Sequence, residues 1–161
     1  MASAQVLHRA LLLSLLVGLA FSTYAGFEKY FLSLTQACTF NLVLSCGGVL
    51  TSGHTTFPPG SSIEDWYWGV GGFVAMIAID IPLIRTYDRR LLYALFGLSL
   101  AGLALVSVFA YTQAAIIQKV CIICVGSYIA DIAVVACAAQ LVRLRRRGDQ
   151  EAEADRTAAS A

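Results

Sequence analysis

Residues 120–142 read VCIICVGSYIADIAVVACAAQLV, an apolar run with a single charged side chain, that of Asp131. A helix needs about 20 predominantly apolar residues to cross the hydrocarbon core of a bilayer. Three more apolar runs precede this one, at residues 10–27, 66–79 and 91–114. The run at 66–79 is long enough if its helix starts near Ser62, after a Pro-Pro-Gly turn, and continues to about residue 84. The chain is therefore predicted to form four transmembrane helices.

The composition favours the same fold class. Apolar residues make up 58% of the chain and charged residues 13%, which leaves too little polar surface for a soluble domain. We expect an all-α membrane protein, a four-transmembrane-helix bundle with a long outward loop between helices 1 and 2, at about residues 28–61. Residues 1–147 are predicted to form a single membrane domain. The polar, alanine-rich residues 148–161 are expected to be a disordered cytoplasmic tail.

Lysine and arginine residues are segregated along the chain. Nine of the eleven lie before the first helix, between the second and third, or after the fourth. Basic residues near helix ends are retained on the cytoplasmic side, so both termini and the middle loop are predicted to be cytoplasmic. Lys29 and Lys119 fall on the other side, with the long loop. The arginine cluster at 143–147 is expected to contact anionic lipid headgroups, and no nucleic-acid partner is predicted.

The N-terminus allows a second interpretation. Residues 11–21 resemble the apolar core of a signal peptide, and Thr23-Tyr24-Ala25 resembles a cleavage site. Cleavage there would leave three helices instead of four. The predicted position of the C-terminus and the cysteine chemistry are the same in both interpretations.

Four of the five cysteines fall on the predicted outward side, although the orientation rests on lysine and arginine alone. Cys38 and Cys46 lie in the long loop, and Cys121 and Cys124 form a C-x-x-C motif where the fourth helix begins. In an oxidising compartment such pairs can exist as disulfides. A helix start lowers a thiol pKa, whereas apolar surroundings raise it, so the sequence leaves the net shift open. Cys137, farther along the helix, is predicted to be a packing residue.

The cysteine pattern can also be compared with three other kinds of site: haem, zinc and structural disulfide. A c-type haem site needs a histidine after the second cysteine, and Val125 stands there. A zinc site usually takes two short knuckles, and seven residues between Cys38 and Cys46 make a poor knuckle, so no metal is expected. Two inert structural disulfides remain an alternative. Disulfide exchange between the two pairs is the preferred interpretation, and His54 is expected to be an ordinary loop histidine.

One face of the fourth helix carries the polar groups of this region. At 100° per residue, Cys121, Cys124, Tyr128 and Asp131 share a stripe that is predicted to point into the bundle. Carboxyls inside a membrane often mark function, but a protonated carboxyl bonded to a neighbouring helix is an equally good account of Asp131 and Asp80. Tyr128 could donate its hydroxyl to a quinone carbonyl or serve as plain core.

The cysteine order resembles that of the vitamin K epoxide reductase family, which includes quinone-reducing, disulfide-forming homologues in bacteria and archaea. The resemblance rests on the Cys38–Cys46 spacing, the following Gly-Gly-Val-Leu-Thr-Ser, the motif Cys121-Ile-Ile-Cys124, and Tyr128 four residues later. It spans about residues 26–130. In the other well-known family of quinone-linked disulfide catalysts, the C-x-x-C comes before the other pair, whereas here it comes last.

The resemblance implies a role for each matched residue. Cys38 would exchange with a thioredoxin-like partner on the outer side, Cys46 would pass electrons to Cys121, and Cys124 would face a membrane quinone. Tyr128 matches a tyrosine that lines the quinone pocket. Asp65 stands where the family often has a quinone-contacting Asn, and an ionised Asp cannot donate that hydrogen bond.

The predicted function is that of a quinone-dependent thiol oxidoreductase that supports disulfide formation. Electrons would pass from the thioredoxin-like protein to a menaquinone, ubiquinone or vitamin K type quinone. A multi-pass protein of a prokaryotic plasma membrane is favoured, with the active cysteines on the non-cytoplasmic side. Two alternatives stay open: a vitamin K epoxide or quinone reductase of an endoplasmic reticulum membrane, and a membrane scaffold with structural disulfides.

Overall fold

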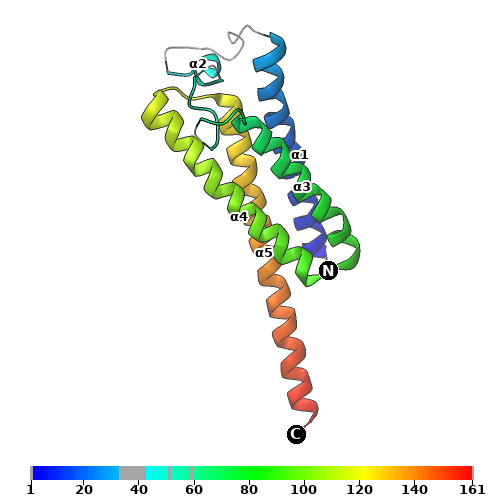
Figure 1. The fold of residues 1–161 in the computed structure, drawn as a ribbon. Helices are drawn as coiled ribbons and strands as arrows, with labels where there is room; N and C mark the ends of the chain where they lie inside the picture. The colour runs from blue at the N-terminus through cyan, green and yellow to red at the C-terminus, as the bar shows by residue number, and fades with distance from the viewer. Residues whose placement is uncertain (1, 33–42, 51, 59, 161) are drawn as a thin grey trace.

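A computed structural model describes residues 2–32, 43–50, 52–58 and 60–160. Its four long helices lie side by side in one bundle (Figure 1). These helices are α1 (Ala2–Phe27), α3 (Asp65–Thr86), α4 (Arg89–Tyr111) and α5 (Ile122–Ala159). Each belongs to a helical segment long and apolar enough to cross a membrane. The prediction of an all-α bundle with four transmembrane helices is confirmed.

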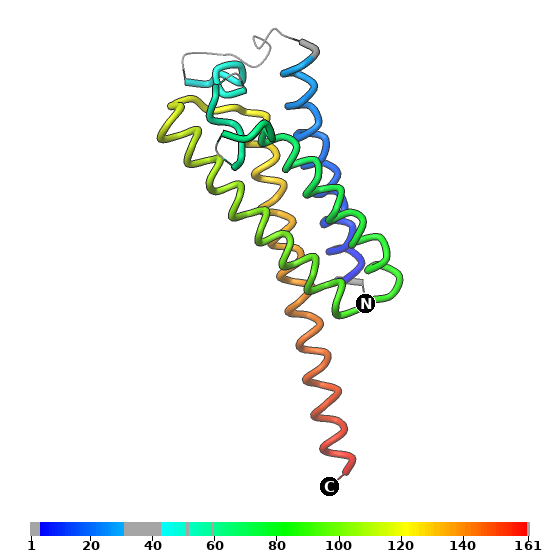
Figure 2. The backbone as a smooth tube through the Cα atoms, viewed as in Figure 1, coloured from blue at the N-terminus to red at the C-terminus, as the bar shows by residue number. Residues whose placement is uncertain are grey.

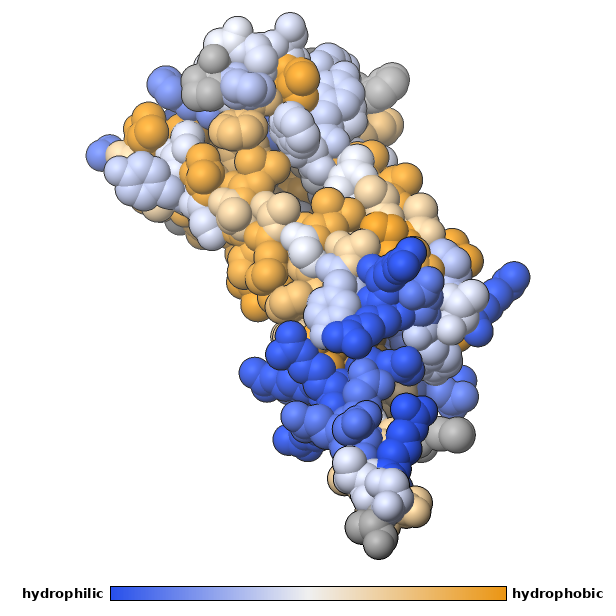
Figure 3. Space-filling model, turned by 60° about the horizontal axis from the view of Figure 1, so that its bottom comes forward, coloured by the Kyte–Doolittle hydropathy of each residue, from blue (hydrophilic) through white to orange (hydrophobic). Residues whose placement is uncertain are grey.

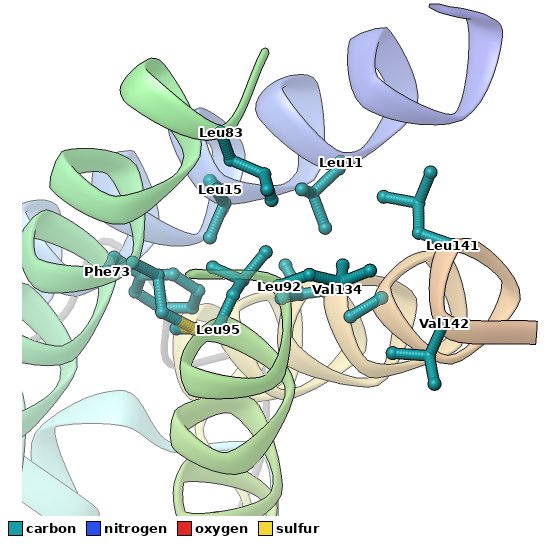
Figure 4. Packing of buried hydrophobic residues seen from close by; sticks show 11 residues of the cluster. Leu11, Leu15, Phe73, Leu83, Leu92, Leu95, Val134, Leu141 and Val142 are labelled. Atoms are coloured by element: carbon teal, nitrogen blue, oxygen red, sulfur yellow. The ribbon is translucent and has the colours of Figure 1, made fainter. Parts of the chain in front are cut away.

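The bundle is held by an apolar core to which all four long helices contribute. Figure 4 shows leucines of α1, α3 and α4 pointing toward side chains of α5. The core residues are Leu11, Leu15, Phe73, Met76, Leu83, Leu92, Leu95, Val134, Ala138, Leu141 and Val142. Helix α1 packs chiefly against α5 and α3, and α4 closes the bundle by packing against the same two helices.

Glycine allows α1 to approach both α3 and α5 closely. A Cβ on Gly18 of α1 would overlap the Phe73 ring of α3, and a Cβ on Gly126 of α5 would lie 2.8 Å from the Phe21 ring of α1. Small residues at such crossings let helices in a membrane approach closely enough for van der Waals packing.

The two ends of the bundle differ in chemistry. At one end, called here the arginine end, Arg85, Arg89, Arg90 and the arginines of 143–147 are exposed. There Asp88 caps α4 by accepting the Arg90 N–H at 2.9 Å, which makes the turn from α3 short. Figure 3 shows strongly hydrophilic residues gathered toward this end and hydrophobic residues across the middle of the same face.

At the other end, called here the cysteine end, a short irregular segment closes the bundle (Figure 2). It contains α2 (Cys46–Leu50) and continues to the start of α3. Two π-helical turns, η1 (Glu28–Leu32) and η2 (Thr112–Ile117), extend α1 and α4 to this end. Of the predicted outward loop, residues 33–42, with Cys38, lie outside the described residues.

The structure differs from the sequence analysis at the C-terminus, because α5 continues through residue 159 where a disordered tail was expected from residue 148. Alanine, glutamate and arginine are strong helix formers and extend a helix that the core has already nucleated. An exposed ion pair between Arg145 and Asp149, at 3.5 Å and one turn apart, adds to this.

Candidate functional site

Three of the four predicted active cysteines meet in one buried cluster at the cysteine end. Cys46 begins α2, Cys121 is the N-cap of α5, and Cys124 lies in the first turn of α5. Their side chains pack with Val49, Leu50 and Ile123, among others, and Cys124, with 6% of its surface exposed, is the most accessible of the three.

Backbone hydrogen bonds hold α2 against the start of α5. The Ser45 N–H donates to the Val120 carbonyl at 3.1 Å, and the Val120 N–H donates to the Val43 carbonyl at 2.8 Å. A side chain at position 48 would clash here, because the Lys119 side chain lies where a Cβ on Gly48 would be. These contacts bring the Cys46 thiol within hydrogen-bond reach of Cys121.

No disulfide joins Cys121 and Cys124 in the structure. The Cys121 sulfur accepts the Cys124 backbone N–H at 3.4 Å, as expected of an N-cap. The pKa of Cys121 is raised above its usual range, first because its thiol is hydrogen-bonded to Cys124 and then because it is buried. The hydrogen bonds from the Cys124 N–H and from Cys46 act in the opposite direction but do not reverse the shift. The net shift of the Cys121 pKa, which the sequence left open, is therefore upward.

An apolar pocket lies directly beside Cys124, between the helices. Side chains of α1, α3, α4 and α5 line it, with Trp66, Phe73, Met76, Leu105, Val106 and Phe109 forming most of the apolar wall. The polar groups on the wall are few, which is typical of pockets that bind small organic molecules. They are Ser22, Asp65, Cys124, Ser127, Tyr128 and Asp131.

Gln113 connects the pocket to the C-x-x-C motif, and the sequence analysis missed this residue. Its side-chain oxygen accepts the Cys121 N–H at 3.3 Å, and its side-chain nitrogen donates to the Tyr128 hydroxyl oxygen at 2.9 Å. Gln113 is 4% exposed and lies in η2. An amide at the end of an apolar run, eight residues before Cys121, was the signal that could have found it.

Asp65 lies where α3 begins and also lines the pocket. One of its carboxyl oxygens accepts the Trp66 N–H at 2.8 Å. The neighbouring Glu64 pairs with Lys29 at 2.8 Å and accepts the indole N–H of Trp66 at 2.9 Å, which ties the start of α3 to the end of α1. The site prediction therefore includes two wall residues of one pocket, Asp65 and Tyr128.

Two other polar predictions fall away from this pocket. His54 is exposed in the segment after α2. Asp80 is buried in α3 and lies 3.3 Å from the His8 ring nitrogen. Among the described residues, no group of three His, Cys, Asp or Glu side chains could hold a metal ion.

The cysteine cluster and its pocket agree with the result of comparing the sequence with known families. A sequence model of the vitamin K epoxide reductase family matches residues 9–139. The chain belongs to this family. No curated protein matches the chain as a relative. A member of the vitamin K epoxide reductase family with four membrane-spanning helices is an integral membrane thiol oxidoreductase, and the matched residues include the whole cluster and pocket.

Proposed function

We propose that this protein passes electron pairs from the thiols of a thioredoxin-like protein, through two cysteine pairs, to a quinone in the pocket beside Cys124. The position of Cys124 carries the proposal. Its side chain packs in the buried thiol cluster with Cys46 and Cys121 and also forms part of the pocket wall. The Cys124 sulfur is thus close both to the other two thiols and to the space that a quinone would occupy.

The proposed thiol steps balance as two exchanges. A thiolate of the partner attacks the Cys38–Cys46 disulfide, and the partner leaves as a disulfide while Cys38 and Cys46 become thiols. Cys46 then attacks Cys121 of the Cys121–Cys124 disulfide, which releases Cys124 and forms a Cys46–Cys121 disulfide. Cys38 attacks Cys46, which restores the Cys38–Cys46 disulfide and leaves the C-x-x-C pair as a dithiol. The hydrogen bond between Cys46 and Cys121 supports the second exchange. The role of Cys38 stays a prediction, because Cys38 lies outside the described residues.

In the last step the C-x-x-C dithiol reduces the quinone. Its two sulfurs give up one electron pair and two protons and become a disulfide, and the quinone becomes a quinol. The apolar wall suits a quinone ring, and the carbonyl oxygens of the ring need hydrogen-bond donors.

Gln113 supports Tyr128 as one such donor. The Cys121 N–H holds the amide oxygen of Gln113, so the NH₂ group of Gln113 faces Tyr128 and donates to its oxygen. The hydroxyl hydrogen of Tyr128 is therefore left for a pocket ligand. The contact of Asp65 with quinone stays a prediction, since its carboxyl must be protonated to donate.

The proposed setting is a prokaryotic plasma membrane with the cysteine end on the non-cytoplasmic side. Reduction of vitamin K epoxide or quinone in an endoplasmic reticulum membrane would use the same four cysteines and is the alternative. A scaffold with structural disulfides would need neither a pocket nor a thiol at Cys124.

The deciding experiment mixes detergent-purified protein with a reduced thioredoxin-like protein and follows the absorbance of menaquinone, ubiquinone or vitamin K quinone in turn. We expect turnover with at least one quinone. Cys124→Ala should abolish it, because no dithiol can then form. Cys137→Ala is the matched control: Cys137 packs against the core away from the pocket, so this variant should turn over as the wild type does.

Two outcomes would reject the proposal. One is the absence of turnover with every quinone tested. The other is a Cys124→Ala variant as active as Cys137→Ala, which is the behaviour expected of a scaffold. Turnover of vitamin K epoxide faster than of any quinone would favour the alternative reductase.

A further inference from the structure

The far wall of the pocket holds a buried carboxyl with an unused oxygen. Asp131 of α5 is 2% exposed and lines the pocket, and its Oδ2 atom is buried without a hydrogen-bond partner. The other oxygen, Oδ1, would lie 3.1 Å from a Cβ on Gly102 of α4, so the missing side chain at Gly102 leaves room for the carboxyl.

The other buried aspartate, Asp80, also has a buried Oδ2 atom without a hydrogen-bond partner, but Asp80 does not line the pocket. Asp80 is fully buried in α3, and its other oxygen is paired with the His8 ring at 3.3 Å. A buried polar group without a partner costs free energy, so a carboxyl that only held two helices together would be expected to have one. The free oxygen of Asp131 therefore points to a partner that comes from the pocket.

The spacing of groups along α5 fits an elongated ligand. Cys124, Tyr128 and Asp131 are separated by four and then three residues, which places all three on one face of the helix. At a rise of about 1.5 Å per residue, Tyr128 and Asp131 are about 4.5 Å apart along the axis. This is comparable to the length of a quinone ring between its two opposite carbonyl oxygens.

We propose that Asp131, as a neutral carboxylic acid, donates the proton that the quinone oxygen farther from Cys124 takes up on reduction. This inference rests on the proposed function. A carboxylate without a cation is disfavoured in an apolar pocket, and a neutral carboxyl has one O–H to donate. Tyr128 and Asp131 then hydrogen-bond opposite ends of the ring.

The proton count of the step balances. The Cys121 and Cys124 thiols give up two electrons and two protons and form one S–S bond. One thiol proton goes to the quinone oxygen near Tyr128 and the other to water, while Asp131 protonates the far oxygen. After the quinol leaves, the Asp131 carboxylate takes a proton from water, so the sum is dithiol plus quinone giving disulfide plus quinol.

The test compares Asp131→Asn, which can donate a hydrogen bond but no proton, with Asp131→Ala, which can donate neither. We expect Asp131→Asn to lower kcat by about 100-fold, within the range of general acid catalysis. Its quinone affinity should stay within about threefold of wild type. Affinity is read from quenching of tryptophan fluorescence, because both tryptophans, Trp66 and Trp68, line the pocket. Asp131→Ala should weaken binding as well.

The matched control is Asp80→Asn, at the other buried carboxyl, which should leave kcat unchanged. A second readout needs no turnover: one infrared C=O band of a protonated carboxyl should be present in wild type and in Asp80→Asn and missing in Asp131→Asn. In wild type the band should move to lower frequency when quinone binds, because the O–H then donates a hydrogen bond. If Asp131→Ala does not fold, the kcat of Asp131→Asn and the infrared band still test the inference.

Turnover of Asp131→Asn at the wild-type rate would overturn the inference. So would an infrared band that does not respond to quinone. Equal losses of affinity and kcat in both variants, with a lower unfolding temperature, would assign Asp131 to packing alone. Failure of the proposed function looks different, because wild type itself would then reduce no quinone.

Discussion

At the scale of single residues, the site depends on a few buried polar atoms with defined partners. Gln113 is buried and makes two hydrogen bonds, one to the Cys121 backbone and one to Tyr128. Neither bond moves electrons. Together they set the direction of the Tyr128 hydroxyl and hold the start of α5, so Gln113 is a positioning residue in the proposed reaction.

Gln113→Ala is therefore expected to lower kcat/KM for quinone about tenfold, which corresponds to a loss of about 1.4 kcal/mol. The reason is that the Tyr128 hydroxyl and the Cys121 N–H each lose a buried partner. Quinone turnover measures the effect. Gln140→Ala is the control, since Gln140 is an exposed amide on α5 away from the pocket.

Tyr128→Phe completes a double-mutant cycle with Gln113→Ala. If Gln113 acts through the tyrosine hydroxyl, the double variant should lose less than the sum of the two single losses. Strictly additive losses would show that Gln113 supports only the backbone of the motif.

At the scale of elements, close helix contacts place the pocket wall. The crossing of α1 and α3 is set by Gly18, whose missing side chain admits the Phe73 ring, and Phe73 is itself part of the wall. On the opposite side, η2 extends α4 and carries Gln113 toward α5. π-Helical turns of this kind often occur at functional sites.

Gly18→Ala should lower the free energy of unfolding by about 1–3 kcal/mol, the usual cost of overpacking a filled core. Gly97→Ala is the matched control, because Gly97 also lies inside a long helix but has open space around its Cα. Thermal unfolding followed by circular dichroism in detergent measures both variants. A Gly18→Ala protein as stable as Gly97→Ala would contradict the assigned contact.

At the scale of the whole molecule, the bundle separates redox chemistry from positive charge. The cysteine cluster and pocket lie toward one end, and the exposed arginines lie at the other. Family membership and the four apolar helices establish an integral membrane protein. Which end faces the cytoplasm is a prediction from the distribution of basic residues.

A labelling experiment in intact cells tests this orientation. Single cysteines are introduced at Gly53, an exposed position at the cysteine end, and at Ala152, an exposed position on α5 beyond the arginines. A maleimide that cannot cross membranes should label Gly53→Cys and not Ala152→Cys, because the arginines are expected to stay inside. Each variant keeps the native cysteines, so labelling is read against the unmodified protein. The reverse pattern would invert the topology.

The sequence by itself determined the four helices, the family and the four candidate cysteines, because long apolar runs and cysteine spacing are local properties of the chain. It also located Tyr128 and Asp131 on one helix face, since helical periodicity needs no partner helix. It did not indicate that α5 continues through residue 159, where good helix formers extend a helix already nucleated by the core.

Only the tertiary structure decided which groups meet. Hydrogen bonding and burial set the upward pKa shift of Cys121, and the pairing of Gln113 with Tyr128 joins residues of two helices. Asp80 and Asp131 look alike in the sequence, as single carboxyls in apolar runs. The fold pairs one oxygen of Asp80 with His8 and places Asp131 in the pocket wall, because hydrogen-bond partners and pockets come from neighbouring helices that sequence periodicity does not identify.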